Sequence, residues 1–145
     1  MVPPLSLRQE DVMGIKAIAR LAAVHIPYTI SAGEAADCQI FVADQDYEIM
    51  DVRETHSIVG AGSSTLDVGV SASGTAPASL TTALSSTFAL DSTVDTPVQA
   101  TLTSTVANRL MDKGEQLSVN ITGTVTSLEG SVSVILKPVR NNYTY

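Results

Sequence analysis

The chain has no tryptophan, two phenylalanines and four tyrosines, so aromatic packing cannot dominate its interior. Valine, isoleucine, leucine and alanine are plentiful, and the core is therefore expected to be aliphatic. A chain of 145 residues has the length of one ordinary domain, which removes roughly two-thirds of its unfolded surface from water. The single cysteine, Cys38, excludes an intramolecular disulfide and is expected to be a small packing residue.

Basic residues are scarce, and none occurs between Arg53 and Arg109. The formal net charge is -7 and the pI is about 4.5. Sequence-independent binding of nucleic acid needs clustered lysine and arginine to neutralise phosphates, so we expect no nucleic-acid partner. Arg8, Lys16 and Arg20 could form a small basic patch, but three such charges are commonly just solvated.

Long apolar runs are also missing. No window of about 18 apolar residues exists, so we expect no membrane-spanning helix. The first residues, Met-Val-Pro-Pro-Leu-Ser, lack the basic start and apolar run of an export signal. We therefore expect a protein that is made and used without the general secretion route.

Catalytic patterns are equally sparse, because the chain has only two histidines and no Gly-x-Ser-x-Gly elbow. His25 lies in the polar phase of a predicted strand and is expected at the surface. His56 ends a polar run with Asp51, Arg53 and Glu54, where a carboxylate could orient it as a base. Charge pairing across neighbouring strands explains the same run equally well. We predict no enzyme and no catalytic residue.

Two acidic pairs, Asp44 with Asp46 and Asp91 with Asp95, could offer oxygen ligands to Ca²⁺. Neither stretch contains the 12-residue loop with its glycine and closing glutamate. Aspartates in turns usually accept hydrogen bonds from local backbone donors. We therefore predict no metal site and no cofactor.

The clearest structural signal runs from Asp112 to Arg140. Apolar residues alternate with polar ones over Leu117–Ile121 and again over Val132–Leu136, which predicts two antiparallel strands that pair with each other. Pro138 cannot donate to a strand ladder, so the last strand should end there or lie at an edge. For the same reason Pro27 suggests an edge position for the strand around Val24–Ile30.

Further strands are expected at 38–43, 47–59, 65–71 and near 98–102. Between them, Leu80 and Leu84 are spaced for a short helix, and Phe88 and Leu90 for a strand. Seven to nine short strands separated by turns predict a mainly β fold, an antiparallel, jelly-roll-like β-sandwich over residues 21–140, followed by a polar tail at 141–145.

Residues 1–20 differ from this pattern and are predicted to be a separate N-terminal arm. Ser6 to Gln9 fits a capping box, and Val12, Ile15 and Ile18 follow helical spacing. Gly14 weakens a helix by about 1 kcal/mol relative to alanine. The segment is therefore either a marginal amphipathic helix or an extended arm that becomes ordered on a partner.

Serine and threonine are abundant where charge is scarce, with 26 of them in the 71 residues from Ser63 to Ser133. The outer faces of the strands should thus be neutral, and such faces can pack against another protein without the desolvation cost of buried charges. Unpaired sandwich edges also need cover, which neighbouring subunits can provide. This composition favours a component of an assembly.

Parts of the chain resemble the strands of small structural proteins of tailed-bacteriophage heads, over roughly residues 45–140. The segments that carry the resemblance are Thr65–Val68, Phe88–Asp91, Leu102–Thr105, Arg109–Val119, Gly123–Thr124 and Leu136–Arg140.

This resemblance implies a capsid decoration, or cement, protein with a jelly-roll-like sandwich. Such a protein binds the exterior of the virion capsid, commonly as a homotrimer at three-fold positions, with arms that reach across major capsid protein subunits. It would be made in the cytoplasm of the host bacterium. The implied capsid contacts are the apolar and charged side chains of the arm: Leu5, Leu7, Arg8, Val12, Ile15, Ile18 and Arg20.

Two other classes were weighed against this interpretation. A tail or head-fibre module that binds a host glycan would need an exposed aromatic side chain for stacking. The candidates are Tyr28, Tyr47, Tyr143 and Tyr145. An enzyme such as a cell-wall hydrolase would need paired catalytic carboxylates or a metal cluster, and the sequence suggests neither.

Overall fold

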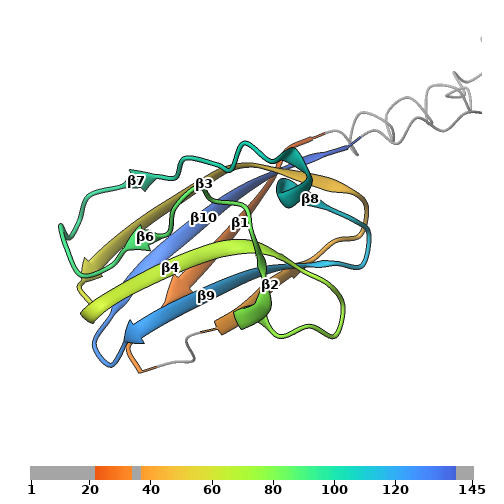
Figure 1. Cartoon of the computed structure of the whole chain (residues 1–145). Helices are drawn as coiled ribbons and strands as arrows, with labels where there is room; N and C mark the ends of the chain where they lie inside the picture. The colour runs from red at the N-terminus through yellow and green to blue at the C-terminus, as the bar shows by residue number, and fades with distance from the viewer. Residues whose placement is uncertain (1–21, 34–36, 140–145) are drawn as a thin grey trace, which may run out of the picture.

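The alternation of apolar and polar residues produces two antiparallel sheets that lie face to face (Figure 1). The computed structural model describes residues 22–33 and 37–139. The predicted arm at 1–20 and tail at 141–145 lie outside these residues. The fold class predicted from the sequence, a mainly β sandwich, is confirmed.

Sheet A contains β1 (Val24–Ile30), β10 (Glu129–Pro138), β3 (Tyr47–Ile58) and β7 (Val98–Gln99) in that order, and β8 (Leu110–Met111) also pairs with β3. Sheet B contains β2 (Asp37–Val42), β9 (Gln116–Thr124), β4 (Ala61–Ser71) and β5 (Thr81–Thr82), and β6 (Phe88–Ala89) also pairs with β4. Two short 3-10 helices, η1 (Pro77–Ser79) and η2 (Val106–Arg109), lie between strands.

The pairing is nested along the chain: β1 pairs with β10, β2 with β9, β3 with β8, and β4 with β5. This is the order of a jelly roll, in which a long antiparallel ribbon is folded over on itself. The strands β1 to β4 alternate between the two sheets, and so do β8 to β10, whereas β4, β5 and β6 all belong to sheet B.

The prediction that the strands around Leu117 and Leu136 pair with each other is therefore wrong. β9 pairs with β2 and β4, whereas β10 pairs with β1 and β3. The connection between them carries Leu128, which is fully buried. The buried Leu128 side chain holds this connection where the chain crosses from sheet B to sheet A. The alternation of apolar and polar residues predicts that a strand forms, but it does not identify the strand that pairs with it.

The core is aliphatic, as expected. Leu66, Val68, Val119, Val134 and Leu136 are at most 1% exposed and come from both sheets. At one end of the sandwich the rings of Phe41 on β2 and Tyr47 on β3 also meet edge to face, with centroids 5.6 Å apart. Cys38, on the edge strand β2, is half-buried.

Both prolines singled out in the sequence have the predicted positions. Within the described residues β1, which contains Pro27, pairs only with β10 and is an edge strand, and β10 ends at Pro138. The short helix expected through Leu80 and Leu84 is absent, because Thr81–Thr82 forms a strand and Leu84 bridges to Leu102. Of the apolar residues in this stretch, Leu84, Phe88 and Leu90 are buried, whereas Leu80 is half-buried.

The two ends of the sandwich differ. Val24 pairs with Leu136, so β1 begins where β10 finishes, on the right in Figure 1. We call this the entry end, and it also holds Val42 and the start of β3. The opposite, far end holds Ile30, Ile58 and Leu128, where β1 and β3 finish and β10 begins.

Candidate functional site

The capsid contacts implied for the arm lie outside the described residues. This applies to all seven: Leu5, Leu7, Arg8, Val12, Ile15, Ile18 and Arg20. They stay predictions. The structure does fix where the segment that contains them joins the sandwich, because residue 22 leads directly into β1 at the entry end.

Exposed apolar side chains rim the entry end. Val42 is 57% exposed at the end of β2, and Leu110 and Val139 are 39% and 36% exposed. Leu110 lies opposite Glu48 of β3, and the Val139 amide donates to the Asp46 carbonyl oxygen. We call Val42, Leu110 and Val139 the entry rim. Apolar groups held in place by backbone pairing form a surface that can bind another protein.

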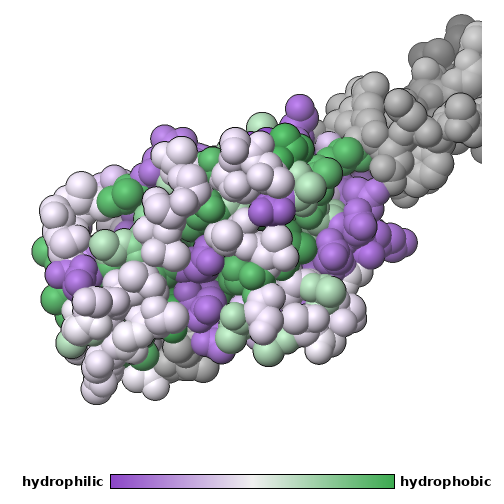
Figure 2. Space-filling view, in the orientation of Figure 1, coloured by the Kyte–Doolittle hydropathy of each residue, from purple (hydrophilic) through white to green (hydrophobic). Residues whose placement is uncertain are grey.

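Most of the visible surface is weakly polar, as the pale colour in Figure 2 shows. On the outer face of sheet A one row of hydroxyl side chains crosses three strands, because Thr29 of β1 lies opposite Ser131 of β10, which lies opposite Thr55 of β3. The sequence-based expectation of neutral strand faces is met in this row.

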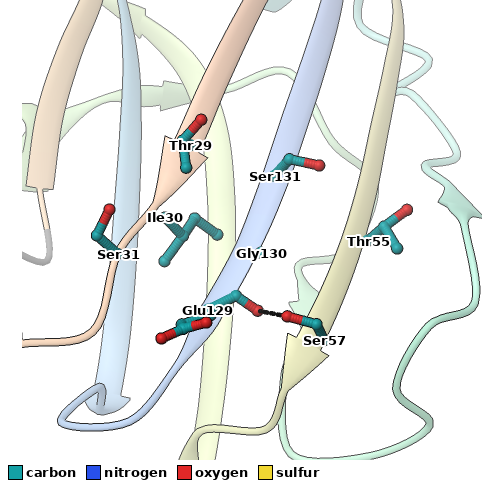
Figure 3. A pocket seen from close by; sticks show the side chains of 8 residues that line it. All are labelled: Thr29, Ile30, Ser31, Thr55, Ser57, Glu129, Gly130 and Ser131. Atoms are coloured by element: carbon teal, nitrogen blue, oxygen red, sulfur yellow. Dashed lines mark hydrogen bonds between the residues drawn. The ribbon is translucent and has the colours of Figure 1, made fainter.

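A hollow of 540 Å³ lies over the same strands at the far end (Figure 3). Its lining is made of hydroxyl side chains, one carboxylate, one isoleucine and a glycine: Thr29, Ile30, Ser31, Thr55, Ser57, Glu129, Gly130 and Ser131. A side chain on Gly130 would place its Cβ 2.7 Å from the Thr55 carbonyl oxygen. The glycine therefore allows β10 to lie close to β3.

The hollow can offer hydrogen bonds and has little else to offer chemically. The Ser57 hydroxyl donates to the Glu129 carbonyl oxygen at 3.4 Å. No aromatic ring, histidine or cysteine lines it. Its lining of hydroxyls and one carboxylate is suited to binding a polar ligand by hydrogen bonds.

His56 is buried, in contrast to a catalytic base that must reach solvent. Its side chain is 2% exposed, and its ring Nδ1 lies 2.8 Å from Oε1 of Glu54, two residues earlier on β3. Its Nε2 lies 2.7 Å from the Ser92 carbonyl oxygen. The pair lies within one strand, whereas charge pairing between neighbouring strands was expected. His25 is exposed, as predicted.

The two groups alter each other's acidity. Burial raises the pKa of Glu54, and the hydrogen bond and charge of His56 oppose this only in part. Burial by itself would lower the pKa of His56. The hydrogen bonds to Ser92 and Glu54, with the charges of Glu54 and Asp95, outweigh it and raise that pKa above its ordinary value.

The remaining polar run on β3 has a structural role. Asp51 is nearly buried on the outer side of sheet A, where its Oδ2 lies 2.8 Å from Nε of Arg53. Its Oδ1 accepts a hydrogen bond from Gln99 of β7 at 2.9 Å. The bond from Gln99 fastens the short strand β7 to β3, and the contact with Arg53 lies within β3, so both oxygens of Asp51 have partners.

In the first acidic pair, the hydrogen-bond donors are a nearby side chain and the backbone of a distant turn, whereas local backbone donors were expected. Asp44 accepts a hydrogen bond from the Tyr47 hydroxyl at 2.6 Å, and Asp46 accepts one from the Lys113 amide at 2.9 Å. Among residues 22–33 and 37–139 no group of three or more histidine, cysteine or acidic side chains could hold a metal ion. Over the same residues no helix is long and apolar enough to cross a membrane.

The tyrosines weighed for sugar stacking are poorly placed for it. Tyr47 is 3% exposed and Tyr28 is half-buried. Tyr143 and Tyr145 lie outside the described residues.

Comparison with solved structures gives a weak likeness. No protein-family model and no curated protein matches the chain. A solved structure, the capsid asymmetric unit of cyanophage Pam1, is similar with a TM-score of 0.48 and 9% sequence identity, over 81% of this chain and 84% of that chain. A similarity at this level carries no argument about function, which must be inferred from the chain itself.

Proposed function

We propose that this protein is a structural component of a bacteriophage head. It binds the outer surface of the assembled capsid, as a trimer at three-fold positions, and stabilises the shell. The proposal is supported by the resemblance of its strand sequences to small phage-head proteins and by the arrangement of the sandwich. It assigns the major capsid protein and other copies of the chain as partners.

The observation that carries the proposal is the entry rim. Val42, Leu110 and Val139 are exposed at the end where residues 1–21 join β1. A predicted apolar arm would therefore leave the sandwich at the end that carries the apolar rim. A partner that binds both would bury apolar surface of each, which favours association by about 25 cal/mol for each Å² removed from water.

The faces of the sandwich suit such packing. The row formed by Thr29, Ser131 and Thr55 places small neutral side chains across sheet A. Neighbouring subunits could cover this row of hydroxyls without removing water from charged groups. The exposed edge of β1 would also be covered in an assembly.

Binding of this kind stabilises a shell by mass action. A protein that binds only the assembled capsid adds a free energy of RT ln(1 + [L]/Kd) for each site, which is about 2.7 kcal/mol at a concentration one hundred times Kd. Three arms on one trimer would bind with an avidity above that of a single arm.

The test compares binding of variants to capsids assembled from the major capsid protein of the same phage. Deletion of residues 1–20 should abolish co-sedimentation with capsids, and Val42→Ser with Leu110→Ser in the full chain should weaken it at least tenfold. The matched control is Ile58→Ser with Val59→Ser, two residues of the far end that are 41% and 38% exposed. Full capsid binding by the truncated chain would refute the arm model.

One observation favours a second function. The hollow at the far end is lined by hydroxyls and Glu129, a set that could bind a saccharide in a tail or head-fibre module. If so, Thr55→Val with Ser131→Ala should remove binding to host surface polysaccharide in calorimetry. Binding to capsids with no affinity for the polysaccharide would exclude this alternative.

A further inference from the structure

The loop that connects β6 to β7 has almost no side chains to hold it. Leu90 is fully buried and Ala100 is half-buried, but all nine residues from Asp91 to Gln99 are exposed. At the start of the loop, the Gly60 amide donates to the Leu90 carbonyl oxygen at 2.9 Å. Beyond that point residues 91–97 depend on polar contacts.

His56 supplies those contacts from beneath. The Ser92 carbonyl oxygen lies 2.7 Å from its Nε2, and the Asp95 amide donates to its backbone carbonyl oxygen at 2.7 Å. Asp95 adopts the left-handed region, with φ at 55°, a conformation that few non-glycine residues hold unaided. One buried histidine therefore fixes two points of an exposed loop.

Both nitrogens of the His56 ring face acceptors, and this fixes the number of protons. A hydrogen bond to the Ser92 carbonyl oxygen needs a proton on Nε2. The contact with Glu54 needs a second proton, which can be on Nδ1 or on the carboxyl group. In either arrangement the Glu54–His56 pair holds two protons, carries no net charge and makes both hydrogen bonds.

Loss of one of these protons leaves only one for two contacts. Glu54 is then an anion that is 1% exposed, and its Oε2 has no hydrogen-bond partner among the described residues. A hydrogen bond to an ionised carboxylate is roughly twice as strong as a neutral one. The remaining proton should therefore stay between Nδ1 and Glu54, and Nε2 would face the Ser92 oxygen with a lone pair.

We infer that residues 91–97 form a proton-controlled latch, closed while the Glu54–His56 pair holds two protons and released when it loses one. The ionisable groups whose charges act on His56 are Glu54 on its own strand and Asp95 in the loop. On β10 its register partner is Gly130, which has no side chain. Release would change the far-end surface, where Ile58, Val59 and Val94 are already exposed.

The experiment measures hydrogen exchange of the full chain between pH 6 and pH 9. The exchange rate of each amide in loop 91–97 is divided by its intrinsic rate. The resulting ratio is compared with the ratio for amides of β9, which serve as an internal reference. Above the pH at which the Glu54–His56 pair begins to lose one proton, the corrected exchange rate of the loop should rise about tenfold per pH unit. The reason is that opening of the loop is linked to the loss of one proton. The reference strand should stay constant.

Glu54→Gln is the informative variant, because a glutamine amide can donate to Nδ1 of a neutral histidine. With its one proton on Nε2, the neutral His56 ring then keeps both the contact with residue 54 and the contact with the Ser92 oxygen. Loop opening in Glu54→Gln should therefore be independent of pH over this range. His25→Gln is the matched control, since it removes the other histidine at an exposed position. It should behave like the parent chain.

If Glu54→Gln fails to fold, the parent chain still decides the matter. In NMR titrations the His56 ring and the Asp95 amide should shift with one shared midpoint. If the corrected exchange rate of the loop does not change with pH while the His56 ring loses its proton, the latch proposal is wrong. A Glu54→Gln chain that keeps the tenfold rise would overturn it as well.

Discussion

At the scale of single residues, three buried serines differ in how their hydroxyls are bonded. Ser64 donates to the Ala61 and Thr124 carbonyl oxygens at 2.7 Å and 3.2 Å. Ser71 and Ser118 are 1% and 0% exposed, and neither hydroxyl has a hydrogen-bond partner among the described residues. A buried polar group without a partner costs about 1–3 kcal/mol, so similar serines should respond differently to substitution.

The first prediction follows from this difference. Ser71→Ala and Ser118→Ala should each raise the free energy of unfolding by about 1 kcal/mol, because alanine lacks the hydroxyl that folding buries away from water without a hydrogen-bond partner. Ser64→Ala, the matched control, should lower it by about 1 kcal/mol because the hydrogen bond of its hydroxyl proton, shared between two carbonyl oxygens, is lost. Urea denaturation measures all three. A loss of stability in Ser118→Ala would mean that its hydroxyl is satisfied after all.

The second prediction concerns pH. The pKa of His56 is raised in the folded state above its ordinary value of 6.5, so its contribution to stability is fully present below pH 6.5 and is lost as pH rises through the folded pKa. The raised pKa of Glu54 acts with the same sign. The urea midpoint should thus fall between pH 6 and pH 9 in the parent chain and stay level in Glu54→Gln. A midpoint that rises over this range would contradict the assignment.

At the scale of elements, the chain after β4 folds back over sheet B. Gly69 pairs with Thr82 of β5, and a Cβ at Gly69 would lie 2.0 Å from the Thr81 carbonyl oxygen and 2.9 Å from Cδ1 of Leu80. The path of residues 80–82 therefore requires glycine at this position of β4. The 3-10 helix η1 follows the same path over β2 and β9 (Figure 1).

The third prediction tests this close approach. Gly69→Ala should lower the free energy of unfolding by about 3 kcal/mol, because the obstructing atoms are backbone and must move. Gly74→Ala is the control: Gly74 has φ at 82° but nothing within 4 Å of an added Cβ. It should cost only about 1 kcal/mol, from the left-handed conformation alone. Equal losses of stability in Gly69→Ala and Gly74→Ala would show that the backbone facing Gly69 moves aside at little cost in free energy.

The elements that could be predicted from sequence are those with simple alternation. Val24–Ile30 was bounded correctly, and the strands near 38–43 and 47–59 were placed within one residue at each end. The partner of β10 could not be predicted, because a buried Leu128 in a turn decides whether the chain pairs back or crosses to the other sheet. Two-residue strands such as β7 also lack enough residues to show a period.

The latch was only half visible in the sequence. Glu54 and His56 are neighbours in a polar run of the sequence, and their spacing of two places both on one face of a strand. That this face points inward, and that Ser92 lies above it, depends on a register shift in β3 opposite Ile135 and Leu136. Such a shift changes which face later residues occupy, and it leaves no clear trace in composition.

At the scale of the whole molecule, one hydrophobic core joins the two sheets. Among the described residues, the buried hydrophobic side chains form one cluster that begins at Ile30 and ends at Leu136. If residues 1–20 are a separate arm, as the sequence predicts, the sandwich should fold without them.

The fourth prediction is that deletion of residues 1–20 leaves a folded protein. Its urea midpoint should correspond to a change in stability of less than about 0.5 kcal/mol, as for changes outside a core. Circular dichroism and denaturation provide the measurement. Light scattering on the same samples gives the oligomeric state, and a full-length trimer of three 15.1 kDa chains would agree with the proposed capsid role. Unfolding of the truncated chain would show that the segment belongs to the sandwich.

The pairing of β1 with β10 has a consequence for how the protein is made. The first strand of the sandwich finds its partner only in the last one, since Val24 lies opposite Leu136. Contacts this distant in sequence form late, because a long loop must close before they contribute. During synthesis β1 therefore has no ladder to join until residues 129–138 have left the ribosome. Sheet A is completed only then, so a chain that is still being translated has no finished domain to which its first 21 residues are fixed.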